Sequence, residues 1–184
     1  MSGSEASGTP ASTLWIMLFT LASTVTTLAL ACATPFTALA ALAATKLRAR
    51  DGMLLMLAAW VASQVVGFCV LDYPRDASTL GWAIALGTAA IAGLIAARMV
   101  AGRLGDRADA LRIAGAYVAA ALAFKLVILC WSSALGGIDI VLSPSINLRQ
   151  FVRNGAILLG LYALYHGLRA VGLPAAPQVR ALRC

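Results

Sequence analysis

Long apolar segments separated by short polar connectors are the feature of this sequence that most limits its fold. Hydrophobic residues make up 61% of the 184 residues and charged residues only 11%, far from the shares typical of soluble domains. About 20 apolar residues in a helix match the hydrocarbon core of a bilayer. The sequence therefore predicts an all-α, polytopic transmembrane bundle of about six helices, over residues 13–33, 36–47, 52–71, 79–101, 111–135 and 148–173.

The sequence outside these segments is too short for a separate water-soluble domain. We expect a polar cytoplasmic leader over residues 1–12, one six-helix transmembrane domain over 13–173, and a cytoplasmic tail over 174–184. The leader contains no Lys or Arg, whereas a cleavable signal peptide needs a positive n-region. We therefore predict that the first apolar segment is kept as the first transmembrane helix.

Two parts of this assignment depart from a regular pattern of long spans. The second segment has only twelve residues, and these would span roughly 18 Å of a core about 30 Å thick. We expect this helix to be short, tilted or shielded by its neighbours. The longest connector, residues 136–147, contains Gly and Pro and is expected to fold back over the bundle as a loop.

The basic residues predict how the helices are oriented. In the six-helix arrangement ten of the fourteen Lys and Arg residues fall on one side of the membrane and three on the other, with Lys125 inside. Basic residues collect in cytoplasmic loops, so both ends of the chain are predicted to be cytoplasmic. The protein is predicted to be a multi-pass protein of a bacterial inner membrane. The three residues on the outer side are Arg75, Arg149 and Arg153.

Small residues recur every four positions on two of the predicted helices. One stripe runs from Gly81 to Ala97 through Ala85, Ala89 and Gly93, and a shorter one contains residues 115, 119 and 123. Small residues let helices approach closely in lipid. The stripes indicate either packing inside the bundle or a docking face for a partner membrane subunit, and the sequence leaves both open.

Lys125 is the sharpest functional candidate, because it lies in the middle of the fifth apolar segment. A charged side chain at this depth is costly and is by default a functional-site hypothesis. No Asp or Glu lies in the middle of any predicted helix, so the sequence offers no intramembrane carboxylate for it. Lys125 is predicted to meet backbone carbonyls, water or an anionic group of a ligand.

Other polar residues lie in the same outer half of the membrane. At 1.5 Å per residue, Gln64 is roughly 12 Å, Lys125 roughly 16 Å and Asn154 roughly 9 Å from the outer helix ends, and Arg153 is next to Asn154. We predict that they meet in one outward-facing pocket. Its apolar walls would come from aromatic residues, which also mark membrane interfaces, namely Phe36, Phe68, Tyr73, Trp82, Tyr117 and Trp131.

The sequence carries no recognisable catalytic, cofactor or nucleic-acid signature. His166 is the single histidine, and there is no phosphate-binding loop, zinc pattern or CxxC pair. Cys32, Cys69 and Cys130 are predicted at similar depth, where apolar packing is favoured over a disulfide or a copper(I) site. The basic residues do not form one continuous polar face, which argues against nucleic acid. We therefore expect neither enzymatic activity nor a bound cofactor.

Three stretches resemble a known family. The run from Thr34 to Ala43 (TPFTALAALA), a basic turn and a Leu-rich helix ending in residues 63–68 (SQVVGF) look like the second and third helices of small S-component-like proteins. The start of the last helix, residues 151–155 (FVRNG), is similar as well. S-components are the substrate-binding membrane subunits of energy-coupling factor transporters, and related six-helix families have no assigned function.

The resemblance implies solute binding. It implies a pocket in the outer half for a vitamin-like or metal substrate, closed by residues 33–36, 72–78 and 136–147, and association with a coupling membrane subunit and ATPases. Lys125 and Arg153 would favour an anionic substrate. The predicted binding residues are Phe36, Gln64, Phe68, Tyr73, Lys125, Arg153 and Asn154. The rival hypotheses are an accessory subunit of a larger membrane complex and, ranked lower, a channel or carrier that works alone; the sequence names neither substrate nor oligomeric state.

Overall fold

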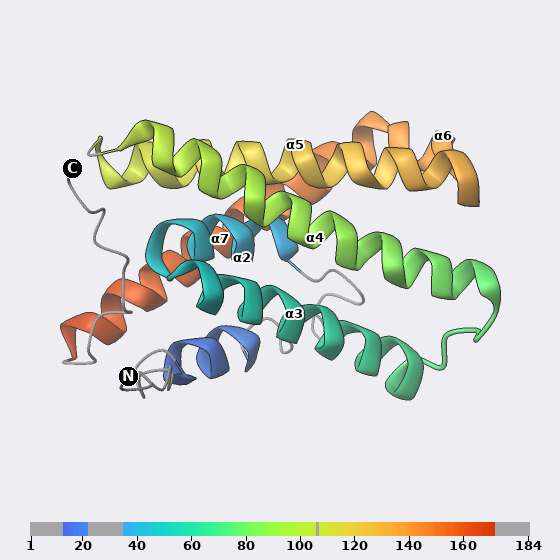
Figure 1. Cartoon of the computed structure of the whole chain (residues 1–184), viewed down its shortest axis with the longest axis horizontal. Helices are drawn as coiled ribbons and strands as arrows, with labels where there is room; N and C mark the ends of the chain where they lie inside the picture. Colours follow the sequence, from blue (N-terminus) through green and yellow to red (C-terminus); the bar gives the residue numbers. More distant parts are fainter. Residues whose placement is uncertain (1–12, 22–34, 106, 172–184) are drawn as a thin grey trace, which may run out of the picture.

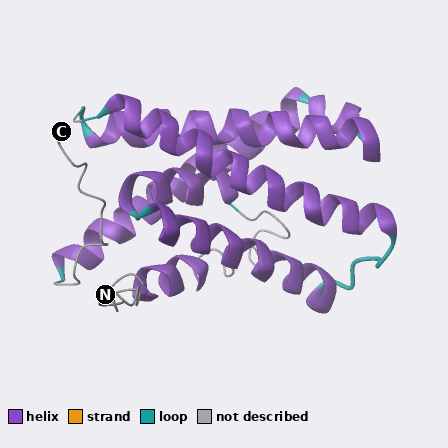
Figure 2. Ribbon diagram, in the orientation of Figure 1, coloured by secondary structure: helices purple, strands orange, loops and turns teal. Residues whose placement is uncertain are grey.

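A computed structural model describes residues 13–21, 35–105 and 107–171, and over these residues the chain is helical and contains no strand (Figures 1 and 2). The predicted all-α class is confirmed. Residues 13–21 are helical, whereas the predicted leader, the tail and the rest of the first segment lie outside the described residues. The further helices are α2 (Phe36–Lys46), α3 (Ala49–Val65) with its π-helical extension η1 (Val66–Val70), α4 (Ala77–Leu104), α5 (Asp109–Leu135), α6 (Ile138–Leu142) and α7 (Pro144–Ala170).

Three of the described helices are long and apolar enough to cross a membrane. They are α3 with η1 (Ala49–Val70), α4 and α5, while α2 is apolar but short. Of the roughly six predicted spans, three are therefore confirmed as long apolar helices within the described residues. The last helix, α7, has the length of a span, but Arg, Asn and His side chains lie among its leucines and lower its apolarity. By their length and composition, these three helices indicate a membrane protein.

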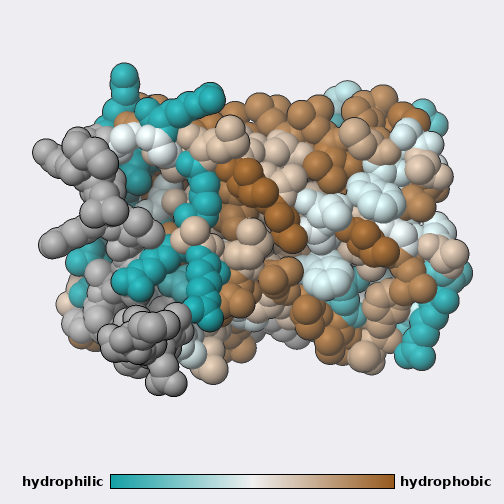
Figure 3. All heavy atoms as spheres, viewed as in Figure 1, coloured by the Kyte–Doolittle hydropathy of each residue, from teal (hydrophilic) through white to brown (hydrophobic). Residues whose placement is uncertain are grey.

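The surface agrees with burial in lipid. Figure 3 shows hydrophobic side chains across the middle of one face and hydrophilic side chains gathered toward the two ends. Large apolar side chains point outward from all the long helices; Leu122 and Leu126 of α5 and Leu159 of α7 are each more than 60% exposed. An exposed apolar surface of this extent is unfavourable in water and favourable in a bilayer.

Helix α2 is the central element, although it is the shortest of the predicted spans. It packs against α3, α4, α5 and α7 (Figure 1). Five of its 11 residues are alanine, and nearly all 11 are buried, because small side chains let four neighbouring helices approach. At 1.5 Å per residue it covers only about half of a bilayer core. The prediction of a short helix shielded by its neighbours is confirmed.

The end of α2 is closed by an arginine from another helix. Nη2 of Arg98, on α4, donates to the backbone carbonyls of Ala43, Leu47 and Arg48 at 3.3, 3.2 and 2.7 Å. The Ala43 and Arg48 carbonyls also accept the backbone N–H groups of Leu47 and Gly52, at 3.1 and 2.9 Å. Arg98 thus adds donors to the turn between α2 and α3 that lipid does not offer. A Cβ added to Gly52 would lie 2.5 Å from the same nitrogen. Glycine at 52 therefore keeps room for this contact.

The small-residue stripe of α4 is packed inside the bundle. Ala85, Ala89, Gly93 and Ala97 are all buried, and helix α5 lies along α4 (Figure 1). A Cβ added to Gly93 would lie 3.3 Å from the backbone oxygen of Ala120 on α5. Of the two interpretations left open by the sequence, internal packing holds for this stripe.

We expect Gly93→Val to destabilise the protein by about 1–3 kcal/mol, because the added side chain forces α4 away from the α5 backbone. Gly102→Val is the matched control, since a Cβ at Gly102 of the same helix meets nothing within 4 Å. Thermal unfolding in detergent compares the two variants. Equal unfolding temperatures would show that the close approach at Gly93 is not required.

The connector after α5 differs from the predicted loop. Residues 138–142 form α6, and α7 begins at Pro144, inside the stretch that was expected to be irregular. The reason is local: proline is favoured in the first turn of a helix, where its missing N–H is not needed. Gly137 before α6 has φ 85°, a left-handed conformation that glycine adopts readily. The prediction of an irregular loop was wrong, and α7 gains a turn that carries Asn147.

Candidate functional site

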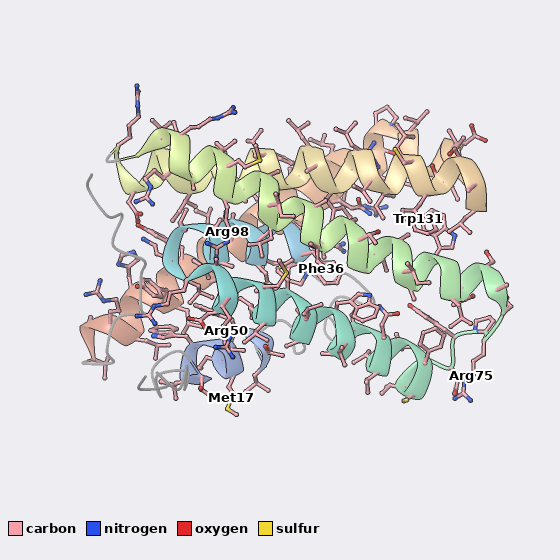
Figure 4. All side chains as sticks on the ribbon, in the orientation of Figure 1. Met17, Phe36, Arg50, Arg75, Arg98 and Trp131 are labelled. Carbon is pink, nitrogen blue, oxygen red and sulfur yellow. The ribbon has the colours of Figure 1, made fainter. Side chains whose placement is uncertain are left out.

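A cavity of about 700 Å³ lies in the half of the bundle that contains the end of α3 and the starts of α4 and α7. The opposite half contains the ends of α2 and α4 and the start of α5. In Figure 4 the labelled Arg50 and Arg98 lie toward this opposite half, whereas Arg75 lies at the end of the molecule that holds the cavity. The structure brings all seven predicted binding residues to the wall of this one cavity. They are Phe36, Gln64, Phe68, Tyr73, Lys125, Arg153 and Asn154.

One side of the cavity is apolar and aromatic. Phe36, at the start of α2, stacks on Phe124 of α5 with ring centroids 6.0 Å apart. Phe68 of η1 and Trp82 of α4 extend this wall. Phe124 was not among the predicted wall residues, since nothing in an apolar helix marks one phenylalanine as facing a cavity. These rings offer a broad surface for the apolar part of a ligand.

The end of α3 is shaped around the cavity by a π-helical turn. A π-turn inserts an extra residue and is often found at functional sites. Its glycine, Gly67, lies against the ring of Tyr73: a Cβ there would be 2.9 Å from Cδ2 of Tyr73. The backbone N–H of Tyr73 also donates to the Gly67 carbonyl at 3.1 Å. The loop after α3 is thereby held against the cavity rim.

This loop ends at a capped helix start. The backbone N–H of Thr79 donates to Oδ1 of Asp76 at 2.7 Å, so Asp76 is the N-cap of α4. The same hydrogen bond stabilises the carboxylate and holds the pKa of Asp76 below its ordinary value. Thr79 lines the cavity, so the cap fixes the rim where α4 begins.

Lys125 contacts an amide, not a carboxylate. Its Nζ donates to Oδ1 of Asn147, a residue in the first turns of α7. Nδ2 of Asn147 donates to the carbonyl of Val141, at the end of α6, at 3.1 Å. The two bonds together fix the orientation of the amide. Asn147 was missed because its stretch was expected to be a loop; the signal that would have found it is Pro144 as a helix start.

Polar residues share one face of α7. Asn147, Gln150, Phe151 and Asn154 all line the cavity, at the three- and four-residue spacing that places side chains on one face of a helix. Arg153 is beside them. Two of their atoms, Nε of Arg153 and Oδ1 of Asn154, are buried without a hydrogen-bond partner. Buried polar atoms are normally satisfied, so these two are available to a ligand or to water.

Tyr117 joins this face of α7 to α5. Its hydroxyl donates to the carbonyl of Phe151, and the two rings have centroids 4.9 Å apart. Gly155 lies beside the same hydroxyl group: a Cβ added to Gly155 would be 3.7 Å from the hydroxyl oxygen of Tyr117. The α5–α7 side of the cavity is therefore held by specific contacts as well as by apolar packing.

Trp131, named above as a wall residue, does not line the cavity. Its Nε1 instead donates to Oγ1 of Thr88, on α4, at 3.0 Å. Cys69 and Cys130 are free thiols with exposed side chains, so the predicted apolar packing was wrong for these two. Cys32 lies outside the described residues.

A second polar cluster lies in the other half of the bundle. Nζ of Lys46, at the end of α2, is 2.6 Å from Oδ2 of Asp109 on α5, and the hydroxyl of Tyr162 on α7 donates to the same oxygen at 2.8 Å. The ammonium also lies 5.4 and 5.6 Å from the ring centroids of Tyr162 and Tyr165. His166 packs edge-on against both rings. These contacts join three helices: α2, α5 and α7.

No family model, curated protein or solved structure matches the chain. Within residues 13–21, 35–105 and 107–171, no group of three or more His, Cys, Asp or Glu side chains is placed to hold a metal ion. The chemistry of the cavity thus rests on its lysine, arginine, amides and aromatic rings.

Proposed function

We propose that this chain is a multi-pass protein of a bacterial inner membrane that binds a small solute in the cavity between α2, α3, α4, α5 and α7. The observation that carries the proposal is an ammonium group at mid-helix depth on a cavity wall, facing an amide. Placing a lysine there is costly for a membrane helix. A ligand that contacts the cation accounts for its presence.

The dimensions and lining of the cavity support this function. About 700 Å³ is within the range of small-molecule sites, which are mostly apolar with a few placed polar groups. The bundle around it is proposed to have six spans with both ends in the cytoplasm, following the distribution of basic residues. The cavity then opens in the outer half. Its lining favours solute binding over enzymatic chemistry, nucleic-acid binding or a bound cofactor.

A binding subunit of this kind lacks its own energy source, because the sequence has no phosphate-binding loop. We propose that it associates with a coupling membrane subunit and ATPases, as the S-component-like stretches suggest. The alternative is an accessory subunit of another membrane complex. The buried position of the α4 stripe leaves fewer small residues for docking to a partner.

Native mass spectrometry in mild detergent tests the binding proposal. The wild type is expected to retain a non-lipid adduct, and Ala121→Trp to lose it, because Ala121 lines the cavity and a tryptophan there fills it. Ala114→Trp is the matched control, because Ala114 is exposed, lies two turns away on the same helix and is outside the cavity lining. A protein that carries no small adduct but a stable protein partner would instead be an accessory subunit, and one that carries only phospholipid would not be a solute-binding protein.

A further inference from the structure

Asn147 is the residue that contacts the ammonium of Lys125 at the cavity wall. Its amide is held on both sides: Oδ1 accepts from Lys125, and Nδ2 donates to Val141 at 3.1 Å. Its backbone N–H donates to the carbonyl of Ser143 at 3.1 Å, within the first turn of α7. The side chain therefore cannot rotate away from the ammonium without breaking two hydrogen bonds.

An amide orients an ammonium without neutralising it. Asparagine and aspartate have nearly the same shape, but only a carboxylate would cancel the charge of Lys125. Among the described residues that line the cavity there are two cations, Lys125 and Arg153, and no Asp or Glu. The ammonium has three donors, and among the described residues Asn147 is the one that accepts from it. The other donors remain for a ligand.

We propose that Asn147 is a specificity-determining residue which keeps the cavity cationic, and that the solute is a free amphipathic organic anion. Its anionic group binds Lys125, and its apolar part lies against the aromatic wall formed by Phe36, Phe68, Trp82 and Phe124. This inference rests on the proposed solute-binding function. It adds to that function the charge class of the solute and the residue that selects it.

A matched pair of probes tests the inference. Naphthalene-2-carboxylate and naphthalene-2-carboxamide share a ring system and differ by one charge at neutral pH. Binding is measured by equilibrium dialysis to the full chain in phosphatidylcholine nanodiscs, with empty nanodiscs to correct for partitioning. The wild type is expected to bind the carboxylate about tenfold or more tightly than the carboxamide, since a charge-assisted hydrogen bond is about twice as strong as a neutral one.

Two variants assign this selectivity to Asn147. Asn147→Asp keeps the shape and supplies a carboxylate to Lys125, so the preference for the anionic probe is expected to vanish. Ser145→Asp is the matched control: it adds the same charge two residues away, at an exposed position outside the cavity lining, and is expected to keep the preference. Thermal unfolding of both variants confirms that each is folded.

Each outcome separates this inference from the proposed function. Equal binding of the two probes by the wild type overturns the anionic class, and an unchanged preference in Asn147→Asp overturns the role of Asn147. Displacement of the carboxylate by phosphatidylglycerol added to the nanodiscs overturns a free solute in favour of a lipid headgroup. If neither probe binds while native mass spectrometry still finds a small adduct, this inference fails and solute binding stands; if the adduct is missing as well, both fail.

Discussion

Asp109→Ala is expected to lower the free energy of unfolding by about 3 kcal/mol, because removing Asp109 leaves the buried ammonium of Lys46 without its counter-charge. The side chain of Lys46 is only 8% exposed, and Asp109 is the carboxylate within reach of its Nζ. Asp109 itself is 36% exposed. Solvent at the carboxylate places the expected effect at the lower end of the range for buried pairs, which is about 3–5 kcal/mol.

The same substitution also removes the acceptor of the Tyr162 hydroxyl group. Three helices meet at this one carboxylate oxygen, since Lys46 belongs to α2, Asp109 to α5 and Tyr162 to α7. Asp109→Asn retains an acceptor for the tyrosine but loses the charge. It is therefore expected to be less destabilising than Asp109→Ala.

Unfolding by heat or by titration with a denaturing detergent measures both variants. Asp139→Asn is the control, because Asp139 is an exposed acid in the first turn of α6, away from the cluster. A loss of stability in the control equal to that in Asp109→Asn would mean that net charge, and not the contact with Lys46, determines the effect.

Depth counting along the helices was enough to place the principal cavity residues. Gln64, Lys125 and Asn154 belong to three different helices, and all three line the one cavity. The count works because a helix rises by a fixed 1.5 Å per residue between two membrane surfaces. It gives the height of a residue and its side of the membrane, but not the direction in which its side chain points.

Side-chain partners far apart in the chain were not predictable in this way. Nothing in the sequence pairs Lys46 with Asp109, because their contact depends on how α2 packs against α5. The same holds for Arg98, which donates to carbonyls in the last turn of α2 and just after it. A count of basic residues gives orientation, but it carries no information on which helix lies beside which.

An error in the bounds of one connector was enough to hide a cavity residue. Glycine and proline in residues 136–147 favoured a loop, yet Pro144 occupies the first turn of α7. Extending α7 toward its start places Asn147 on the same helix face as Gln150 and Asn154. The partner of Lys125 was therefore missing from the predicted site, even though Lys125 itself was identified.

Lys125→Met is expected to weaken binding of the retained anionic solute by about ten- to a hundredfold, because a hydrogen bond to a charged group contributes about 1.5–3 kcal/mol. The variant is not expected to be less stable than the wild type. A lysine at the centre of a membrane helix costs about 2.5–3.5 kcal/mol. Replacing the lysine removes this cost, but it leaves Oδ1 of Asn147 without its donor, which destabilises the protein by about 1–3 kcal/mol.

Because the two terms nearly cancel in Lys125→Met, the double variant Lys125→Met/Asn147→Leu separates them. It removes the ammonium together with its acceptor and is expected to be at least as stable as the wild type, although the carbonyl of Val141 loses its donor. Detergent unfolding and adduct retention, measured on the same preparations, test this combination. If Lys125 instead stabilises the fold, both variants are expected to be less stable than the wild type by 2 kcal/mol or more, roughly the effect of breaking a buried polar contact. If Lys125 serves to bind a ligand, the variants are expected to keep their stability and lose binding. In that case ligand binding is what offsets the free-energy cost of a lysine at this depth.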